Sequence, residues 1–304
     1  MKDGKLMIFK KLCLEDKDTI DEYIYPYKFL SCEYSFTSLY IWKDACDVQY
    51  AIYKQALILK KKDFDGNYHF MQPLGYERED LAEIIEELKT YREENHMKYL
   101  FKDLEESFIE EFNVLLNKKN EFYIEEDRDN FDYLYEAKKL MTLAGKKLHS
   151  KKNHYNSFTK TYDYEVVEIT DDKVIKDVII AAEKWYEETD EKDIKLYYEL
   201  LAIKSIVNNM DLLNLNGVAV YVDGKVGAFS IGESLNEDLA VIHIEKGDKN
   251  LNGIYSFIAK TLVDKCFNKT KIINREQDLG IDGLRKSKMS YYPLKLEKKF
   301  ILSF

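Results

Sequence analysis

Apolar residues recur along this chain with two different periods, and each period predicts one kind of secondary structure. Around residues 81–91 the apolar positions are three and four apart, the spacing of one face of a helix. Residues 239–246 alternate instead, as the residues of a half-buried strand do. In the first half of the chain these periods predict strands at 6–12, 48–53, 56–61, 68–71, 98–102 and 121–125, and helices at 14–25, 32–44, 81–91 and 108–116.

The second half of the chain repeats the same order of elements. Asp223-Gly224 stands between two β-prone runs and is the strongest hairpin signal in the sequence. Asp171-Asp172 precedes an apolar helical face, where a helix is expected to begin. The predicted strands are 164–169, 217–222, 226–234, 239–246 and 271–274, the predicted helices are 171–186, 194–210 and 254–262, and the residues through Tyr292 and Leu296 supply a short helix and a final strand.

Both halves follow the order strand, helix, helix, three strands, helix, strand, helix, strand, although their residues do not match. We interpret this order as an α/β (α+β) protein of two tandem domains, each a mixed sheet flanked by helices. The predicted domains are 1–135 and 163–304. Residues 136–162 between them are helical by propensity and contain no proline, which predicts a basic connecting helix rather than a flexible linker.

Composition excludes several classes of protein. The chain has 304 residues, enough for two domains with their own cores, and its 24 Tyr, 16 Phe and 2 Trp are too many for a disordered chain. It has no apolar run near the length of about 20 residues that spans a membrane and no signal-peptide core in its first fifteen residues, so we expect a cytoplasmic protein without an integral membrane segment. The four cysteines and five histidines have no metal-ligand spacing, which predicts free thiols and no metal site.

The charge of the chain is distributed unevenly. The net charge is -10, which argues against a DNA partner. Residues 137–162, however, contain seven lysines and no acidic residue, and the rest of the chain then has 39 basic against 56 acidic residues, or -17. Such a basic segment is either a local binding site for anions or a solvated helix face, and composition alone does not choose between them.

The repeated order of elements is that of the GNAT acyltransferase fold, and a tandem pair resembles the Fem-type aminoacyl transferases. Specific motifs sharpen this resemblance in the basic segment and near the end of the chain. They are similar to those of a bacterial family related to the C-terminal domain of phosphatidylglycerol lysyltransferase. The motifs are GKKLHSKKNHYNSF at 145–158, HIEK at 243–246, INREQDLG at 273–280, GLRKSK at 283–288 and SYYP at 290–293.

The resemblance implies the transfer of an acyl or aminoacyl group to an amine or hydroxyl. In the lysyltransferase and Fem relatives the donor is aminoacyl-tRNA, whereas ordinary GNAT enzymes use acyl-CoA and bind its pyrophosphate on a glycine-rich loop. The corresponding loop at 246–253 has the wrong glycine spacing, and Asp248 places a negative charge where phosphate oxygens would lie. We therefore expect no cofactor, disfavour acetyl-CoA or another acyl-CoA, and expect aminoacyl-tRNA as the donor, held by the basic segment.

Two alternatives stay open beside this hypothesis: an acyl-CoA-dependent N-acetyltransferase, and a non-catalytic tandem GNAT-like binding module. The acceptor also stays open among a small molecule, a peptide and a lipid head group. The relatives act beside a membrane anchor, and no such segment is recognisable in this sequence.

The family motifs supply the candidate residues. The candidates for catalysis are Lys286, Lys288, Tyr291 and Glu276. The candidates for substrate binding are His243, Glu245, Asn274, Arg275, Asp278 and Arg285. The candidates for binding the tRNA donor are Lys147, Lys151, Lys152, Asn153, His154 and Asn156.

These residues also have purely structural interpretations. The charged residues after 274 can form an ion-pair cluster, and Tyr291 can lie at the rim of a core. His243 can be a buried histidine with satisfied hydrogen bonds. The sequence does not decide between the chemical and the structural roles.

Overall fold

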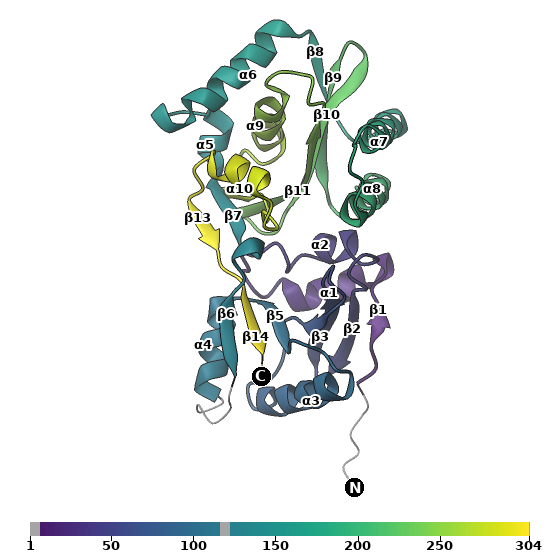
Figure 1. Ribbon diagram of the computed structural model, residues 1–304, viewed down its shortest axis with the longest axis vertical. Coiled ribbons are helices and arrows are strands. Elements are labelled where there is room, and N and C mark those ends of the chain that lie inside the picture. The colour runs from purple at the N-terminus through teal and green to yellow at the C-terminus, as the bar shows by residue number, and fades with distance from the viewer. Residues whose placement is uncertain (1–6, 116–121, 304) are drawn as a thin grey trace. The chain divides into compact units, whose positions relative to one another are not determined.

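The computed structural model describes residues 7–115 and 122–303, which fold into two units (Figure 1). One unit consists of residues 1–131 and 298–304, and the other of residues 132–297. Each unit is built on a seven-stranded mixed sheet with helices packed against it, as the repeated order of elements predicts. No helix within the described ranges is long and apolar enough to cross a membrane.

The sheet of the first unit contains one parallel pair among antiparallel strands. Across the sheet its strands are β1 (Lys10–Lys11), β2 (Gln49–Tyr53), β3 (Ala56–Lys62), β4 (Tyr68–Phe70), β5 (Phe101–Leu104), β14 (Phe300–Ser303) and β6 (Tyr123–Glu126). Its helices are α1 (Lys17–Ile24), α2 (Phe36–Ile41), α3 (Leu81–Glu94) and α4 (Glu106–Leu115). The parallel pair is β4 with β5. The apolar stripe of α3 is fully buried in the core of this unit, as its spacing predicts.

The second unit has the same arrangement of strands. Across its sheet the strands are β13 (Lys295–Glu297), β7 (Asp132–Glu136), β12 (Ile272–Asn274), β11 (Leu239–Gly247), β10 (Lys225–Ser234), β9 (Asn216–Val222) and β8 (Tyr164–Glu168). Its helices are α5 (Ala137–Thr142), α6 (His149–Thr161), α7 (Asp172–Glu187), α8 (Ile194–Val207), α9 (Ile254–Cys266) and α10 (Asp282–Met289). Here β11 and β12 form the parallel pair.

Local sequence signals explain how several elements of the second unit begin and turn. Asp223 and Gly224 have φ angles of 50° and 74° and join β9 to β10, as expected for a two-residue hairpin turn. The side chain of Asp171 caps α7 by accepting the backbone N–H groups of Lys173 and Val174. At Gly253, before α9, a Cβ atom would lie 2.2 Å from the carbonyl oxygen of His154. Only glycine therefore lets α6 pack this closely against the start of α9.

Each sheet also contains one strand from a distant part of the sequence. β7 follows β6 along the chain but pairs with β12 and β13 in the second sheet. β14 follows β13 but pairs with β5 and β6 in the first sheet. The two strands therefore occupy equivalent places in the two sheets. The observed units, 1–131 with 298–304 and 132–297, differ for this reason from the predicted boundaries of 1–135, 136–162 and 163–304.

Residues 136–162 do not form one connecting helix. Leu143 has a left-handed conformation with a φ of 48°, and Gly145 has a φ of 99°, so α5 ends before α6 begins. Leu140, Leu143 and Phe158 are buried in the core of the second unit together with α9. The basic segment is therefore an integral part of that unit.

The remaining differences from the predicted elements are small. α2 covers only part of the predicted helix at 32–44, and β5 begins three residues later than the strand predicted at 98–102. The predicted start of the first strand at Leu6, the helical position Leu116 and the strand start at Glu121 lie outside the described residues.

Candidate functional site

The parallel pair of the second unit opens at one end. Pairing between β11 and β12 stops at Val241 and Asn274, whereas β11 continues to Gly247. On its other side β11 carries a bulge, because Ile231 pairs with Ile244 and Gly232 with Ile242. His243 is the extra residue of this bulge. Bulges commonly redirect side chains beside functional sites, and here His243 and Glu245 reach the chain that follows β12.

His243 lies between two carboxylates. Its Nδ1 atom is 2.9 Å from Oε1 of Glu276, and its Nε2 atom is 2.9 Å from Oε1 of Glu233. Burial alone would lower the pKa of this fully buried imidazole, but the hydrogen bonds to Glu233 and Glu276 outweigh burial and raise the pKa to about 9. At neutral pH His243 is therefore a cation that holds both carboxylates.

Arg275 and Glu245 form a second buried pair. Nη2 of Arg275 donates to Oε1 of Glu245 across 2.7 Å. Burial would lower the pKa of Arg275, but the charge of Glu245 more than offsets it, and the guanidinium stays charged. The other terminal atom of each group, Nη1 of Arg275 and Oε2 of Glu245, is buried without a hydrogen-bond partner within the described residues. Such atoms are uncommon in folded proteins, and the two at this site are candidate contacts for a ligand or an ordered water.

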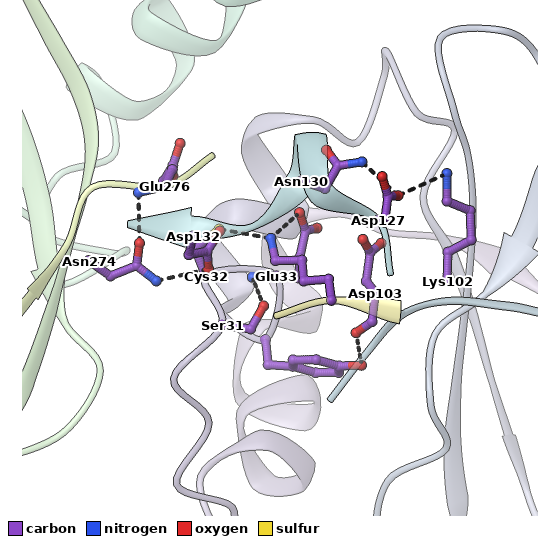
Figure 2. Close-up of polar contacts among 12 residues, drawn as sticks. Ser31, Cys32, Glu33, Lys102, Asp103, Asp127, Asn130, Asp132, Asn274 and Glu276 are labelled. Atoms are coloured by element: carbon purple, nitrogen blue, oxygen red, sulfur yellow. Dashed lines mark hydrogen bonds and ion pairs between the residues drawn. The ribbon is translucent and has the colours of Figure 1, made fainter. Parts of the chain in front are cut away.

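The chain after β12 is held in a strained conformation. The fully buried Asn274 donates from Nδ2 to Asp132 across 2.9 Å and accepts the backbone N–H of Glu276 across 2.7 Å (Figure 2). Glu276 has a φ of 55°, a left-handed conformation that this contact supports. Asn274 therefore shapes the turn that carries Arg275 and Glu276, and its own amide is fully engaged by the protein.

Asp278 ties this turn to α10. Its carboxylate accepts two hydrogen bonds from the guanidinium of Arg285, at 2.8 and 2.9 Å, and one from the hydroxyl of Tyr133 at 2.5 Å. Burial would raise the pKa of Asp278, but the bonds from Arg285 and Tyr133 hold it well below its usual range. Lys288 of α10 donates to the carbonyl oxygen of Arg275. Asp278, Arg285 and Lys288 thus position the turn rather than face an open space.

Aromatic rings cover the Arg275 guanidinium. Its Cζ atom lies 4.7 Å from the ring centre of Tyr291 and 5.6 Å from that of Tyr135. Burial raises the pKa of Tyr291, so its phenol stays protonated at neutral pH and can donate a proton or a hydrogen bond. The Tyr291 hydroxyl lies 3.5 Å from the hydroxyl of Ser256 on α9.

The basic residues of α6 and the turn before it separate into two groups. Lys151 is half-buried, and its Nζ atom lies 4.2 Å from the ring centre of Tyr291. Lys147 and Lys152 are exposed, and Lys147 lies over the ring of Tyr292. Asn153 and His154 are also exposed, whereas Asn156 is half-buried.

The structure brings most of the predicted site residues together in the second unit. The residues that contact one another around the open strand pair are His243, Glu245, Asn274, Arg275, Glu276, Asp278, Arg285, Lys288 and Tyr291, with Lys151 over the last of these. Lys286 is not among them, because it is exposed on α10. Within the described residues no group of three or more histidine, cysteine or carboxylate side chains could hold a metal ion.

Sequence reasoning missed four residues of this site: Asp132, Tyr133, Tyr135 and Glu233. Three of them lie on β7, which was assigned to the first domain and the connecting helix. The run of the β-prone residues Tyr133, Leu134 and Tyr135 is the signal that could have revealed this strand. Glu233 reaches His243 only because of the bulge in β11, and periodicity gives no sign of that bulge.

The first unit also contains a buried cluster of charges, of which Glu33 and Asp103 are labelled in Figure 2. Lys61 bridges Glu33 and Asp103 at 2.5 and 2.9 Å, and the fully buried Lys299 reaches Glu33 at 3.1 Å. The opposite charges of this cluster contact one another, so we interpret it as a structural cluster.

A family model described as phosphatidylglycerol lysyltransferase, C-terminal, matches residues 26–303 of this chain. An uncharacterised protein of Mycoplasmoides gallisepticum is 30% identical over 183 residues, which are 59% of this chain and 57% of that protein. The match thus spans little more than half of that relative's length.

Solved structures extend the comparison. A conserved protein of unknown function from Bacteroides thetaiotaomicron is 30% identical and superposes with a TM-score of 0.88, covering 98% of this chain and 100% of that chain. The structure of L-PGS from Bacillus licheniformis is 14% identical with a TM-score of 0.63, covering 94% of this chain and 91% of that one.

More distant structures agree in fold alone. FemX is 9% identical with a TM-score of 0.57, covering 97% of each chain. A tandem GNAT protein from the clavulanic acid biosynthesis pathway is 6% identical with a TM-score of 0.51, covering 98% of this chain and 97% of that one. The predicted tandem GNAT-like fold is confirmed by these superpositions.

Proposed function

This chain belongs to the family of the phosphatidylglycerol lysyltransferase C-terminal domain, and we propose on that premise that it transfers an aminoacyl group from aminoacyl-tRNA to an amine or hydroxyl. Family and fold together are those of a GNAT/Fem-like acyltransferase. The donor and the acceptor are the parts that we infer from the geometry of the second unit.

The observation that carries the proposal is the buried pair of Arg275 and Glu245 with its two unpaired atoms. Aminoacyl transfer needs a donor at the carbonyl oxygen, where negative charge develops, and an acceptor for the proton of the attacking group. Nη1 of Arg275 is a cationic donor, and Oε2 of Glu245 is an acceptor in the same ion pair. Their burial removes water, which strengthens the interaction of both groups with a reacting ester.

A reaction follows from these two atoms. The acceptor amine or hydroxyl attacks the ester carbonyl of the aminoacyl group, and its proton passes to Glu245. Arg275 donates to the oxyanion of the tetrahedral intermediate. The ester C–O bond then breaks, and the departing tRNA hydroxyl takes a proton from the Tyr291 phenol. Tyr291 regains a proton from the protonated Glu245, so both side chains return to their starting states and no net proton is gained or lost.

The loop before α9 supports tRNA rather than coenzyme A as the donor. A pyrophosphate would need the free backbone N–H groups of this loop. Here the N–H of Asp248 donates to Gly227, that of Asn250 to the Asp248 carboxylate, and that of Asn252 to the hydroxyl of Tyr162. The protein itself therefore uses donors that coenzyme A would require, and we propose that the reaction needs no cofactor.

Exposed lysines support binding of the tRNA phosphates. Six of the seven lysines in the basic segment are exposed, and this segment packs beside the site through α9. Lysines bind phosphate through charge and do not distinguish one nucleotide sequence from another. This is expected if the protein holds the tRNA donor by its phosphate backbone. The exposed lysines are Lys138, Lys139, Lys146, Lys147, Lys152 and Lys160.

The test is a transfer assay with purified protein. Total tRNA charged with radiolabelled amino acids is mixed with a panel of small amines, peptides and phosphatidylglycerol vesicles, and labelled products are separated from remaining ester. We expect one acceptor class to become labelled. Glu245→Gln should lower the rate by about 100-fold, because the proton acceptor is lost while the bond from Arg275 can persist. Glu237→Gln, at an exposed carboxylate, is the matched control.

A second arm separates the alternatives. Acetyl-CoA at about 100 times a typical dissociation constant would stabilise a binding protein by about 2.7 kcal/mol, so a clear rise in melting temperature would contradict our choice of donor. Binding of charged tRNA without transfer to any acceptor would contradict catalysis and identify a non-catalytic binding module.

A further inference from the structure

Lys151 differs from the other lysines of the basic segment. It is half-buried, with its Nζ atom 4.2 Å from the ring centre of Tyr291, whereas the others are exposed. Within the described residues no carboxylate forms an ion pair with it, although Glu245 lies close enough to influence its pKa. A lysine placed only to contact tRNA phosphates would gain nothing from this burial.

A second cation approaches the same aromatic ring. The Arg275 guanidinium lies 4.7 Å from the ring centre of Tyr291, and its Nη1 atom is buried without a partner within the described residues. Burial and the charge of Arg275 lower the pKa of Lys151. Two partly desolvated cations beside one ring repel unless an anion joins them.

Glu245 alone does not satisfy this pair. Its Oε1 atom accepts from Nη2 of Arg275, and within the described residues no hydrogen bond joins Glu245 to Nη1 of Arg275 or to Lys151. The Arg275 Nη1 donor and the Lys151 ammonium are therefore two cationic groups beside the Tyr291 ring that have no hydrogen-bonded carboxylate partner of their own within the described residues.

We propose that Lys151 and Arg275 together hold the anionic oxygen that forms on the aminoacyl carbonyl, so that Lys151 is a catalytic residue. This inference rests on the proposed function and deepens it. When the acceptor attacks, the carbonyl π bond becomes an oxyanion, which receives hydrogen bonds from both cations. When the ester C–O bond breaks, the oxyanion becomes a carbonyl again, and neither cation gains or loses a proton.

The kinetic test compares substitutions at adjacent lysines of α6. Lys151→Ala should lower the single-turnover rate of aminoacyl transfer by about 100-fold, the usual effect of removing one oxyanion donor. Its tRNA affinity and salt dependence should match those of the parent protein. Lys151→Arg should recover part of the rate, because it keeps the charge. Lys152→Ala should instead weaken tRNA binding, and Lys225→Ala, at an exposed lysine of β10, should change neither quantity.

The proposal would be overturned by the opposite pattern. If Lys151→Ala weakens tRNA binding and its salt dependence as Lys152→Ala does, while the single-turnover rate is kept, Lys151 holds a phosphate of the donor. Thermal melting of each variant identifies any general loss of folding. If Lys151→Ala is unfolded, the same comparison of rate and tRNA binding is made with Lys151→Arg.

A binding measurement separates this proposal from the proposed function. 1-Aminoethylphosphonate is a tetrahedral anion that resembles the intermediate of aminoacyl transfer, and calorimetry measures its binding without any turnover. We expect the parent protein and Lys225→Ala to bind it, and Lys151→Ala to bind it at least 10-fold more weakly. If this holds but no aminoacyl group is transferred, the cation pair stands and the proposed function falls. If transfer occurs and Lys151→Ala matches the parent protein in both rate and phosphonate binding, the cation pair falls and the function stands.

Discussion

The site depends on a histidine that does not face an open space. His243 was a candidate for substrate binding, but both of its ring nitrogens contact carboxylates of the protein. Its effect on chemistry is therefore indirect: it holds Glu276, whose neighbour Arg275 carries the unpaired donor. A neutral imidazole can donate only one of its two hydrogen bonds, so this arrangement needs the protonated form.

This requirement predicts a loss of stability in alkaline solution. The pKa of His243 in the folded chain, about 9, lies above its ordinary value of 6.5. The stabilisation that protonated His243 gives the folded state is fully present below pH 6.5 and is lost as the pH rises through 9. The unfolding free energy should therefore fall by about 3 kcal/mol across this interval, measured by urea titration at several pH values. His243→Gln should flatten the fall, whereas His149→Gln, at an exposed histidine, should keep it; equal profiles for all three proteins would contradict this assignment.

At the scale of elements, the exchanged strand β14 is fixed by one buried lysine. Lys299 precedes this strand, is fully buried, and contacts Glu33 at 3.1 Å and the thiol of Cys32 at 3.7 Å. The next residue toward the N-terminus, Lys298, is half-exposed and pairs with Glu126 at the surface. Two adjacent lysines thus have opposite environments.

Substitutions of these two lysines should differ sharply in effect. Lys299→Met keeps the length of the side chain but leaves Glu33 with less compensation in a buried place, and should cost about 3 kcal/mol of unfolding free energy. Lys298→Met breaks only an exposed pair and should change stability by less than about 1 kcal/mol. Chemical denaturation of both variants measures the difference. Similar midpoints would show that the buried lysine does not anchor β14.

The elements also show what sequence could and could not predict. Strong periodicity predicted helices such as α3, and the Asp223-Gly224 turn predicted the hairpin of β9 and β10. Both signals lie within a few residues of sequence, so they can be read without the fold. The strand β7 was missed, since the helical propensity of the residues after 136 obscured a β-prone run of only five residues. The exchange of β7 and β14 depends on long-range pairing, which no local pattern encodes.

The candidate site was predictable to a similar extent. The family motifs around 243–246 and 273–291 contain the residues that converge there, so recognition of the motif found the place. Their contacts could be read only from the structure: Lys286 and Lys288 look alike in sequence, but Lys288 contacts the Arg275 carbonyl and Lys286 is exposed. Which lysine of α6 turns inward was equally hidden, because Lys151 and Lys152 are adjacent.

For the whole molecule, the distribution of charge predicts how a tRNA donor must bind. The seven lysines of residues 137–162 belong to a chain that otherwise carries a charge of -17, from 39 basic and 56 acidic residues. The net charge of the rest of the chain therefore disfavours a polyanion, and the basic segment is the stretch of sequence that most favours one. Binding should weaken steeply as salt rises, with a logarithmic slope set by the number of phosphates that these lysines neutralise.

Substituting Lys147 and Lys152 by alanine together should reduce that slope by about 1.4 to 1.8, because each removed phosphate contact contributes about 0.7 to 0.9. The fold should persist, since both side chains are exposed and neither forms a buried ion pair. Lys225 and Lys269 are exposed lysines of the same unit outside the basic segment, and their double alanine variant is the matched control. Titration of labelled tRNA at several salt concentrations measures the three slopes. Equal slopes for both double variants would mean that tRNA binding depends on the overall charge of the protein and not on the basic segment. Binding by the parent protein that does not change with salt would mean that the basic segment does not bind the tRNA donor.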